Sequence, residues 1–109
     1  MAYTSKYRMA RISPTKARLV MDMIRGKRID EAKVILQMSK LRAAALISGV
    51  LDSAIANADQ AEANIRSLVI TDARADAGPT MKRFQPKDRG RAHPILKRTS
   101  HLTVAVDSK

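Results

Sequence analysis

The sequence contains no cysteine and no tryptophan, and its only aromatic residues are Tyr3, Tyr7 and Phe84. The absence of cysteine excludes disulfides, thiolate metal sites and thiol nucleophiles. So few aromatic residues argue against a surface on which unstacked bases lie on aromatic rings. The N-terminus has no apolar signal region, and no apolar run approaches the roughly eighteen residues of a membrane span. We therefore expect a cytoplasmic protein with no membrane partner.

Catalytic groups are also scarce. His93 and His101 are the only histidines, and neither lies at metal-ligand spacing from other ligand-type residues. The sequence has no phosphate-binding or dinucleotide-binding glycine motif, no nucleophile-elbow motif and no zinc-protease motif. The acidic residues Asp52, Asp59, Glu62, Asp72 and Asp76 are spread along the nearly neutral part of the chain, which is typical of a solvated surface rather than of an acid–base pair. We expect no enzyme activity, no metal and no cofactor.

The positive charge of the chain is clustered. The net charge is +11, and the 109 residues are enough for one domain, which we place at residues 1–109. Residues 1–28 hold eight basic residues and one acid, residues 78–101 hold seven basic residues and one acid, and residues 29–77 are nearly neutral. Clustering of this kind is the electrostatic signature of nucleic-acid binding. An anionic membrane is the competing partner, but no basic amphipathic helix with bulky aromatic residues supports it.

The basic stretch at residues 78–101 reads GPTMKRFQPKDRGRAHPILKRTSH and lies between apolar, strand-like runs at residues 68–70 and 102–106. One interpretation is a loop without regular structure. The other is a protruding two-stranded arm that turns at residues 88–91, with Gly90 supplying a positive φ. Such an arm would reach roughly 40 Å, against a radius of gyration of about 13 Å for a domain of this size. Because an isolated ribbon is marginal in water, a polyanion outside the protein should hold it.

The rest of the chain predicts three helices and three strands. Residues 3–11 form an edge strand with Lys6 and Arg8 exposed, and alternation places Ala10 on their face. Ser13 and Pro14 begin a short amphipathic helix that ends at Gly26. Further helices are expected from Asp30 and from Ser39, the last ending between residues 57 and 61.

Gly49 lies inside the third predicted helix, where glycine costs about 1 kcal/mol against alanine, so we expect close packing there. Residues 66–76 and 99–106 form paired antiparallel strands. The fold class is then α+β, with three helices packed on a small antiparallel sheet and a long protruding β-hairpin.

Strand periodicity places positive charge on both faces of the arm. Met81, Arg83, Gln85 and Lys87 alternate with Lys82, Phe84 and Pro86. Charge on both faces suits an arm threaded between RNA helices better than a ribbon lying on a surface. Gln85, Thr99 and Ser100 are candidates for contacts to base edges or 2′-hydroxyls. A free-standing regulatory nucleic-acid-binding protein remains an alternative, although a wholly electrostatic surface provides little target specificity.

Five segments of the sequence together resemble the motifs of one protein family. They occur in the same order as in that family and at nearly the same spacing. They are SPTKARLVMDMIRGK (Ser13 to Lys27), SAIANA (Ser53 to Ala58), GPTMKR (Gly78 to Arg83), GRA (Gly90 to Ala92) and ILKRTSHLTV (Ile95 to Val104). The family is the L22 family of large-ribosomal-subunit proteins, in its bacterial form. The resemblance runs almost from end to end of the chain.

The resemblance implies a structural protein of the large subunit that binds its rRNA and supports subunit assembly. It also implies a hairpin that passes through rRNA to line the polypeptide exit tunnel. The expected partners are large-subunit rRNA, neighbouring large-subunit proteins, the nascent polypeptide and, indirectly, macrolide antibiotics. The expected tunnel-facing tip is Asp88, Arg89, Gly90, Arg91 and Ala92. From charge and resemblance, the expected rRNA-binding residues are Lys6, Arg8, Arg11, Lys16, Arg18, Arg25, Lys27, Arg28, Lys82, Arg83, Lys87, Lys97, Arg98, Thr99 and Ser100.

Overall fold

The computed structural model describes the backbone of residues 2–87 and 91–108, and the side chains of residues 2–80 and 98–107. The helices and strands follow one another along the chain in an α+β order. They are β1 (Tyr3–Ala10), α1 (Pro14–Ile24), α2 (Ile29–Met38), α3 (Arg42–Gln60), a short 3-10 turn η1 (Ile65–Ser67), β2 (Leu68–Lys87) and β3 (Arg91–Ser108).

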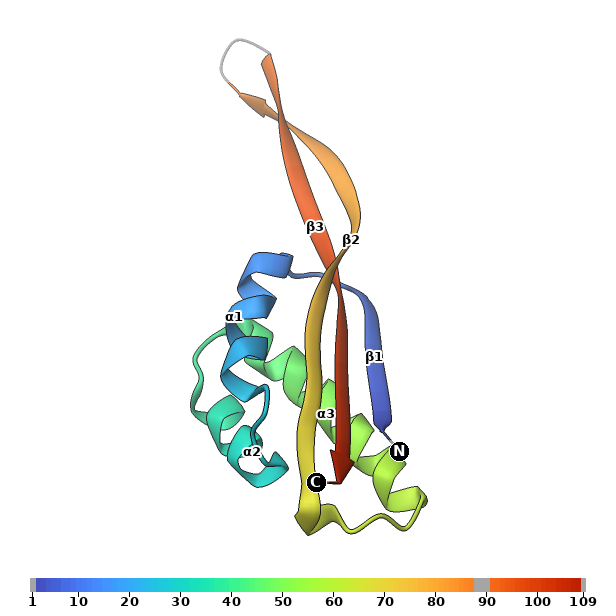
Figure 1. Ribbon diagram of the computed structural model, residues 1–109. Helices are drawn as coiled ribbons and strands as arrows, with labels where there is room; N and C mark the ends of the chain where they lie inside the picture. The colour runs from blue at the N-terminus through green and yellow to red at the C-terminus, as the bar shows by residue number, and fades with distance from the viewer. Residues whose placement is uncertain (1, 88–90, 109) are drawn as a thin grey trace.

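The strands form one antiparallel sheet in the order β1-β3-β2. The three helices lie on one side of this sheet and leave the other side uncovered (Figure 1). In this order the central strand is β3, the last strand in the sequence. Strand β1 pairs with it from Tyr3 opposite Val106 to Ala10 opposite Ser100. The expected α+β architecture, with β1 at a sheet edge, is confirmed.

The core lies between the helices and the sheet. From α1, the residues Ala17, Val20, Met21 and Ile24 are fully buried, as their helical spacing predicts. Helix α3 contributes Ile47 and several small residues, which bring its backbone close to the sheet. The sheet side of the core is formed by Leu68, Ile70, Leu102, Val104 and Val106. These residues alternate with exposed or partly exposed positions along β2 and with polar or small ones along β3.

The arm is a continuous extension of β2 and β3. Their backbone pairing runs outward from the sheet as far as Lys87 opposite Arg91, and the two strands project well beyond the helices (Figure 1). The molecule measures 62 × 24 × 16 Å and has a radius of gyration of 16.8 Å, above the about 13 Å expected for a compact chain of this length. The hairpin interpretation is confirmed, and the loop without regular structure is excluded. The predicted turn geometry at Gly90 lies outside the described residues.

The helix starts were predicted with mixed success. Ser13 caps α1 as expected, since its Oγ accepts a hydrogen bond from the Lys16 N–H at 3.4 Å. The predicted cap of α2 is wrong, because Arg28 occupies that position and Asp30 lies in the first turn. There its carboxylate meets the positive end of the helix dipole. The predicted start of α3 is also wrong: Ser39 ends α2, and its Oγ accepts from the Leu41 N–H at 3.3 Å.

The expected close packing at Gly49 is wrong. A Cβ placed on Gly49 would meet no atom within 4 Å, and the residue is exposed. The buried face of α3 runs instead through Ala43, Ile47, Val50 and Ala54. Gly49 therefore lowers the helix propensity of α3 without a packing gain in return.

Candidate nucleic-acid interface

The uncovered face of the sheet carries the cations of β1. Lys6 and Arg8 are both exposed there, as predicted. Across the sheet, Lys6 lies opposite Thr103 of β3, and Thr103 lies opposite Arg74 of β2. Arg74 is neutralised by Asp72, since its Nε lies 3.0 Å from the Asp72 carboxylate. Within the described part of the chain, Lys6 and Arg8 have no such carboxylate partner.

Strand β1 is interrupted by a bulge just before it ends. Its register with β3 shifts between Tyr7 and Ala10, and Met9 has a φ of 57°. A bulge turns the following side chain to the other face. Ala10 is consequently fully buried rather than on the face of Lys6, where alternation had placed it. Met9 itself is 56% exposed at the end of the uncovered face.

A second irregularity lies opposite the bulge, where β2 leaves the sheet and enters the arm. The register of β2 and β3 shifts between Ala77 and Thr80. At Gly78 an added Cβ would lie 2.6 Å from the Thr99 Oγ1, so a larger residue would force the Thr99 side chain to move. Thr99 Oγ1 donates to the Pro79 carbonyl at 2.6 Å. We call this part of the molecule, residues 77–80 with 98–101, the arm root.

Thr99 and Ser100 are structural residues of the arm root. Both are buried, at 3% and 0% exposure. The Ser100 hydroxyl donates to the Ile12 carbonyl at 2.6 Å, as the Thr99 hydroxyl does to Pro79. Neither hydroxyl is available to a 2′-hydroxyl or a base edge, so we remove both residues from the expected rRNA-binding set.

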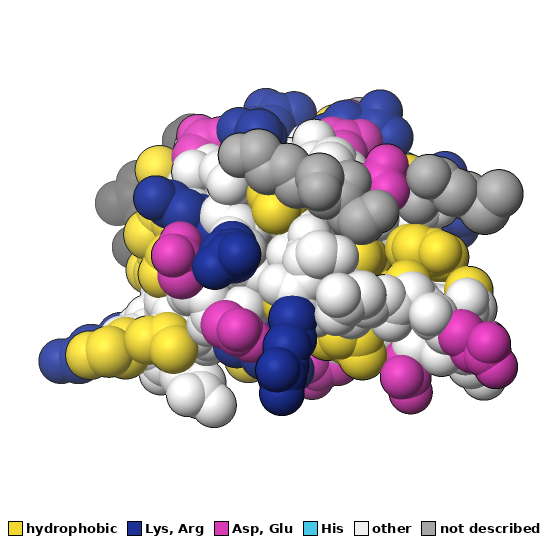
Figure 2. Space-filling model, turned by 60° about the horizontal axis from the view of Figure 1, so that its bottom comes forward, with side chains coloured by type: hydrophobic (Ala, Val, Ile, Leu, Met, Phe, Trp, Pro, Cys, Tyr) yellow, Lys and Arg dark blue, Asp and Glu magenta, His cyan; other side chains and the backbone are white. Residues whose placement is uncertain are grey.

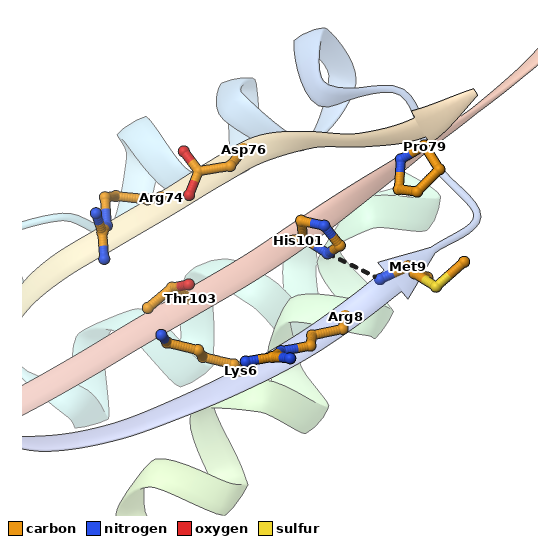
Figure 3. Close-up of a pocket in the computed structure, with 8 residues that line it drawn as sticks. All are labelled: Lys6, Arg8, Met9, Arg74, Asp76, Pro79, His101 and Thr103. Atoms are coloured by element: carbon orange, nitrogen blue, oxygen red, sulfur yellow. Dashed lines mark hydrogen bonds between the residues drawn. The ribbon is translucent and has the colours of Figure 1, made fainter.

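His101 follows them on the uncovered face and is partly buried. The Met9 N–H donates to its Nδ1 at 3.1 Å (Figure 3). Nδ1 is therefore the unprotonated nitrogen, and Nε2 carries the hydrogen. This bond ties the bulge of β1 to β3 beside the arm root. No sequence signal placed His101 in a site, because its partner is a backbone N–H 92 residues away.

A shallow pocket of about 390 Å³ lies on the uncovered face beside the arm root. The side chains around it come from all three strands (Figure 3). They are Lys6, Arg8, Met9, Arg74, Asp76, Pro79, His101 and Thr103. Two of the predicted rRNA-binding residues, Lys6 and Arg8, are thus brought together with six residues that were not predicted.

Arg18 of α1 and Arg25, which caps its C-terminus, hold the helix on the sheet. Arg18 Nε donates to the Ala75 carbonyl at 3.0 Å. Arg25 donates to the Ala73 carbonyl and pairs with Asp22 at 2.7 Å. Both guanidinium groups therefore satisfy backbone carbonyls of β2, and only their remaining N–H groups are available to a phosphate.

The other cations of residues 1–28 are exposed. The turn after α1 pairs with the outer edge of β2, since the Gly26 N–H donates to the Ile70 carbonyl and the Ile70 N–H to the Lys27 carbonyl. Gly26 has a φ of 80°, which only glycine adopts without strain. Arg11, Lys16, Lys27 and Arg28 are exposed, as are Lys6, Arg8 and the two arginines above.

In the arm, Arg98 is exposed and lies opposite Thr80. The side chains of the other expected arm residues lie outside the described part of the structure. These are Lys82, Arg83, Gln85, Lys87, Arg91, Ala92 and Lys97, while Asp88, Arg89 and Gly90 are not described at all. The expected division of arm side chains between two faces therefore stays a prediction.

The end of the molecule opposite the arm has a different surface. Figure 2 turns this end toward the viewer, and acidic side chains are interspersed there with basic ones. The helical side also exposes large apolar residues, among them Met23, Val34, Met38 and Leu41. These residues surround a shallow apolar hollow between α1 and the start of α3. No charged side chain lines this hollow, so it offers no ion pair to a phosphate group.

The described residues hold no cluster of three or more histidine, aspartate or glutamate side chains suited to a metal ion. Among the helices that the structure describes, none is both long and apolar enough to cross a bilayer.

Comparison with known protein families gives one match over nearly the whole chain. Residues 5–107 match the family described as ribosomal protein L22p/L17e. The matched range begins inside β1 and ends inside β3, so it includes the helices, the sheet and the arm.

Proposed function

The chain belongs to the L22p/L17e family of ribosomal proteins, and we propose that its arm penetrates large-subunit rRNA and lines the polypeptide exit tunnel. The family consists of structural proteins of the large ribosomal subunit, which bind rRNA and neighbouring ribosomal proteins and are not enzymes. Its members reside in the ribosomes of the cytoplasm. Beyond family membership, we propose a role for the arm, a role in subunit assembly and a set of contact residues.

The observation that supports the proposal most is the shape of the arm together with its sequence. Two paired strands leave the sheet and extend the molecule to 62 Å. The stretch that forms them carries seven basic residues and one acid. A ribbon of this kind gains little from its own packing, whereas each phosphate that it neutralises releases counterions and favours binding. Such contacts position a protein on folded RNA without reading sequence.

The proposed rRNA-binding residues are the cations of residues 1–28 and five basic residues of the arm. Arg18 and Arg25 remain in the set, with part of each guanidinium used inside the protein. The others are Lys6, Arg8, Arg11, Lys16, Lys27, Arg28, Lys82, Arg83, Lys87, Lys97 and Arg98. We treat residues 1–109 as one domain whose arm is held by rRNA.

The tip, residues 88–92, is proposed to face the tunnel and meet the nascent polypeptide. Changes at the tip would then alter the action of macrolide antibiotics indirectly, through the shape of the tunnel. The proposal rests here on family membership and on the reach of the arm. An arm that brought rRNA domains together would also support subunit assembly.

The salt dependence of rRNA binding tests the phosphate role of the arm. Neutralising roughly eight phosphates gives a slope of log affinity against log salt of about −6 to −7. Replacing Lys82, Arg83, Lys97 and Arg98 with alanine should reduce the magnitude of this slope by about 3. The matched control removes four exposed cations from the nearly neutral part of the chain, Lys33, Lys40, Arg42 and Arg66. We expect it to change the slope by less than about 1.

An unchanged slope in the arm variant, or an equal change in both variants, would contradict the proposed role of the arm. Sedimentation of a cell lysate in a high-salt sucrose gradient provides the second readout. The unmodified chain should migrate with the large subunit at one copy per subunit. A chain found only at the top of the gradient would contradict the ribosomal role altogether.

A further inference from the structure

The pocket beside the arm root lies between two irregularities of the sheet. Met9, in the bulge of β1, lines one side, and Pro79, in the register shift of β2, lines the other. His101 of the central strand lies between them (Figure 3). The volume of about 390 Å³ lies within the about 300–1,000 Å³ typical of sites for small organic groups. Bulges recur next to binding sites because they redirect a side chain.

Two hydrogen-bonding groups of opposite kind, from neighbouring strands, line this pocket. The N–H of Met9 occupies His101 Nδ1 and leaves the Nε2–H as a donor. Asp76 lies directly opposite His101 on β2, which places the two Cβ atoms about 5 Å apart. In the described structure, neither the His101 Nε2–H nor the Asp76 carboxylate has a protein partner. The pair offers one donor and two acceptor oxygens to a ligand.

The rest of the rim supplies positive charge and an apolar contact. Lys6 and Arg8 are exposed on β1, and the charge of Arg74 is already compensated by Asp72. Met9 and Pro79, both exposed, form the apolar end of the pocket. A methionine thioether packs well against an aromatic ring system. Cations, an apolar wall and a donor–acceptor pair are thus arranged around one hollow.

We propose that this pocket binds one unstacked nucleotide of the rRNA, and that it prefers guanine. The Watson–Crick edge of guanine carries two adjacent N–H donors beside one carbonyl acceptor. The donors match the Asp76 carboxylate, and the acceptor matches the His101 Nε2–H. The base lies against Met9 and Pro79, while Lys6 and Arg8 bind the adjoining phosphates. Single-stranded rRNA is read in this way, on the exposed edges of unstacked bases.

Other ligands match the pocket less well. A phosphate group alone would meet the negative charge of Asp76 beside the cations. Uracil presents a single N–H between two carbonyl oxygens, and these oxygens would face the carboxylate. The inference rests on the proposed function, since it names the rRNA element that the sheet face recognises. It adds base recognition to contacts that are otherwise purely electrostatic.

The test is a titration of the ¹⁵N-labelled full-length chain with the tetraribonucleotides UUGU and UUUU. The amide signal of Met9 reports on the pocket, because its N–H is bonded to His101. We expect UUGU to bind about tenfold more tightly than UUUU at this signal, as for one bidentate base contact. The variant Asp76→Asn should reduce this ratio to about one. The matched control Asp52→Asn, an equal charge change at an exposed position of α3, should keep it.

A ratio near one in the unmodified chain would overturn the proposal. So would a ratio retained in Asp76→Asn, or the absence of any shift of the Met9 signal with either oligonucleotide. The failure of the proposed function is measured separately, by the salt slope on large-subunit rRNA and by sedimentation with the large subunit. A chain that keeps both of these properties without a guanine preference would leave the ribosomal role in place and exclude the nucleotide site.

Discussion

Strands β2 and β3 pass through two regions, the sheet and the arm. Their backbones pair in both regions, but the helices cover them only in the sheet (Figure 1). In the sheet, alternate residues such as Leu68, Ile70 and Val104 are fully buried under the helices. Beyond Gly78 the same two strands remain paired, but they project past the helices into open space (Figure 1). The difference indicates that backbone pairing alone does not explain the stability of either region. The body is stabilised by apolar burial, and the arm is expected to be stabilised by the RNA around it.

The largest expected effect on stability comes from a buried side chain of the body, compared with an exposed one. Leu51 is fully buried in the centre of α3. The variant Leu51→Ala should lower the free energy of unfolding by about 2–5 kcal/mol, through lost burial and a cavity. Chemical denaturation of the full chain measures this change. Met38→Ala is the control, since Met38 is 78% exposed, and its effect should stay within about 0.5 kcal/mol. Equal effects at the two positions would contradict the assignment of the core.

The next effect compares two glycines at the boundary and in the body. Gly78→Ala forces a Cβ against the Thr99 Oγ1 at the arm root and should destabilise the protein by about 1–3 kcal/mol. Gly49→Ala meets open space on α3 and should stabilise it by about 0.8 kcal/mol. Thermal or urea unfolding of both variants provides the comparison. Changes of the same sign would show that the arm root is less tightly packed than described.

The smallest expected effect on stability comes from removing the end of the arm. Deleting Pro86 to Pro94 should change the free energy of unfolding by no more than about 0.5 kcal/mol, because the core lies elsewhere. The shortened chain should still enter the large subunit, which sedimentation of cell extracts can establish. Loss of cooperative unfolding on this deletion would show instead that the arm contributes to the folding of the body.

The sequence predicted those features that depend on residues close together in the chain. Ser13 followed by Pro14 identified the start of α1, and the apolar runs on either side of the basic stretch identified the hairpin. The errors arose where a distant partner decides the outcome. Met9, in the bulge, donates its N–H to His101, 92 residues away, and the Ser100 hydroxyl donates to the carbonyl of Ile12, 88 residues away. Neither partner can be identified from local spacing, so both the pocket and the structural role of Ser100 were missed.

Local rules also failed where two of them competed. Ser39 is a good residue for starting a helix, yet it ends α2 and leaves a short connection before α3. Asp30 suits a cap as well as a first turn, and the first turn prevailed because the backbone of Arg28 already lies in the extended conformation that caps require. Propensity therefore identified which helices exist and the start of α1, but it placed the starts of α2 and α3 at Asp30 and Ser39 instead of Ile29 and Arg42.

The strand order has a consequence for the order in which the protein is made. The first strand, β1, lies beside β3 alone, and its partners there are residues 100–106. During synthesis β1 therefore leaves the ribosome almost a whole chain length before the strand with which it pairs. The helices can form as they emerge, but the sheet cannot close until its central strand has been translated. Such long-range pairing folds slowly, so we expect the first strand of a newly made chain to stay unpaired until residues 100–106 have been translated.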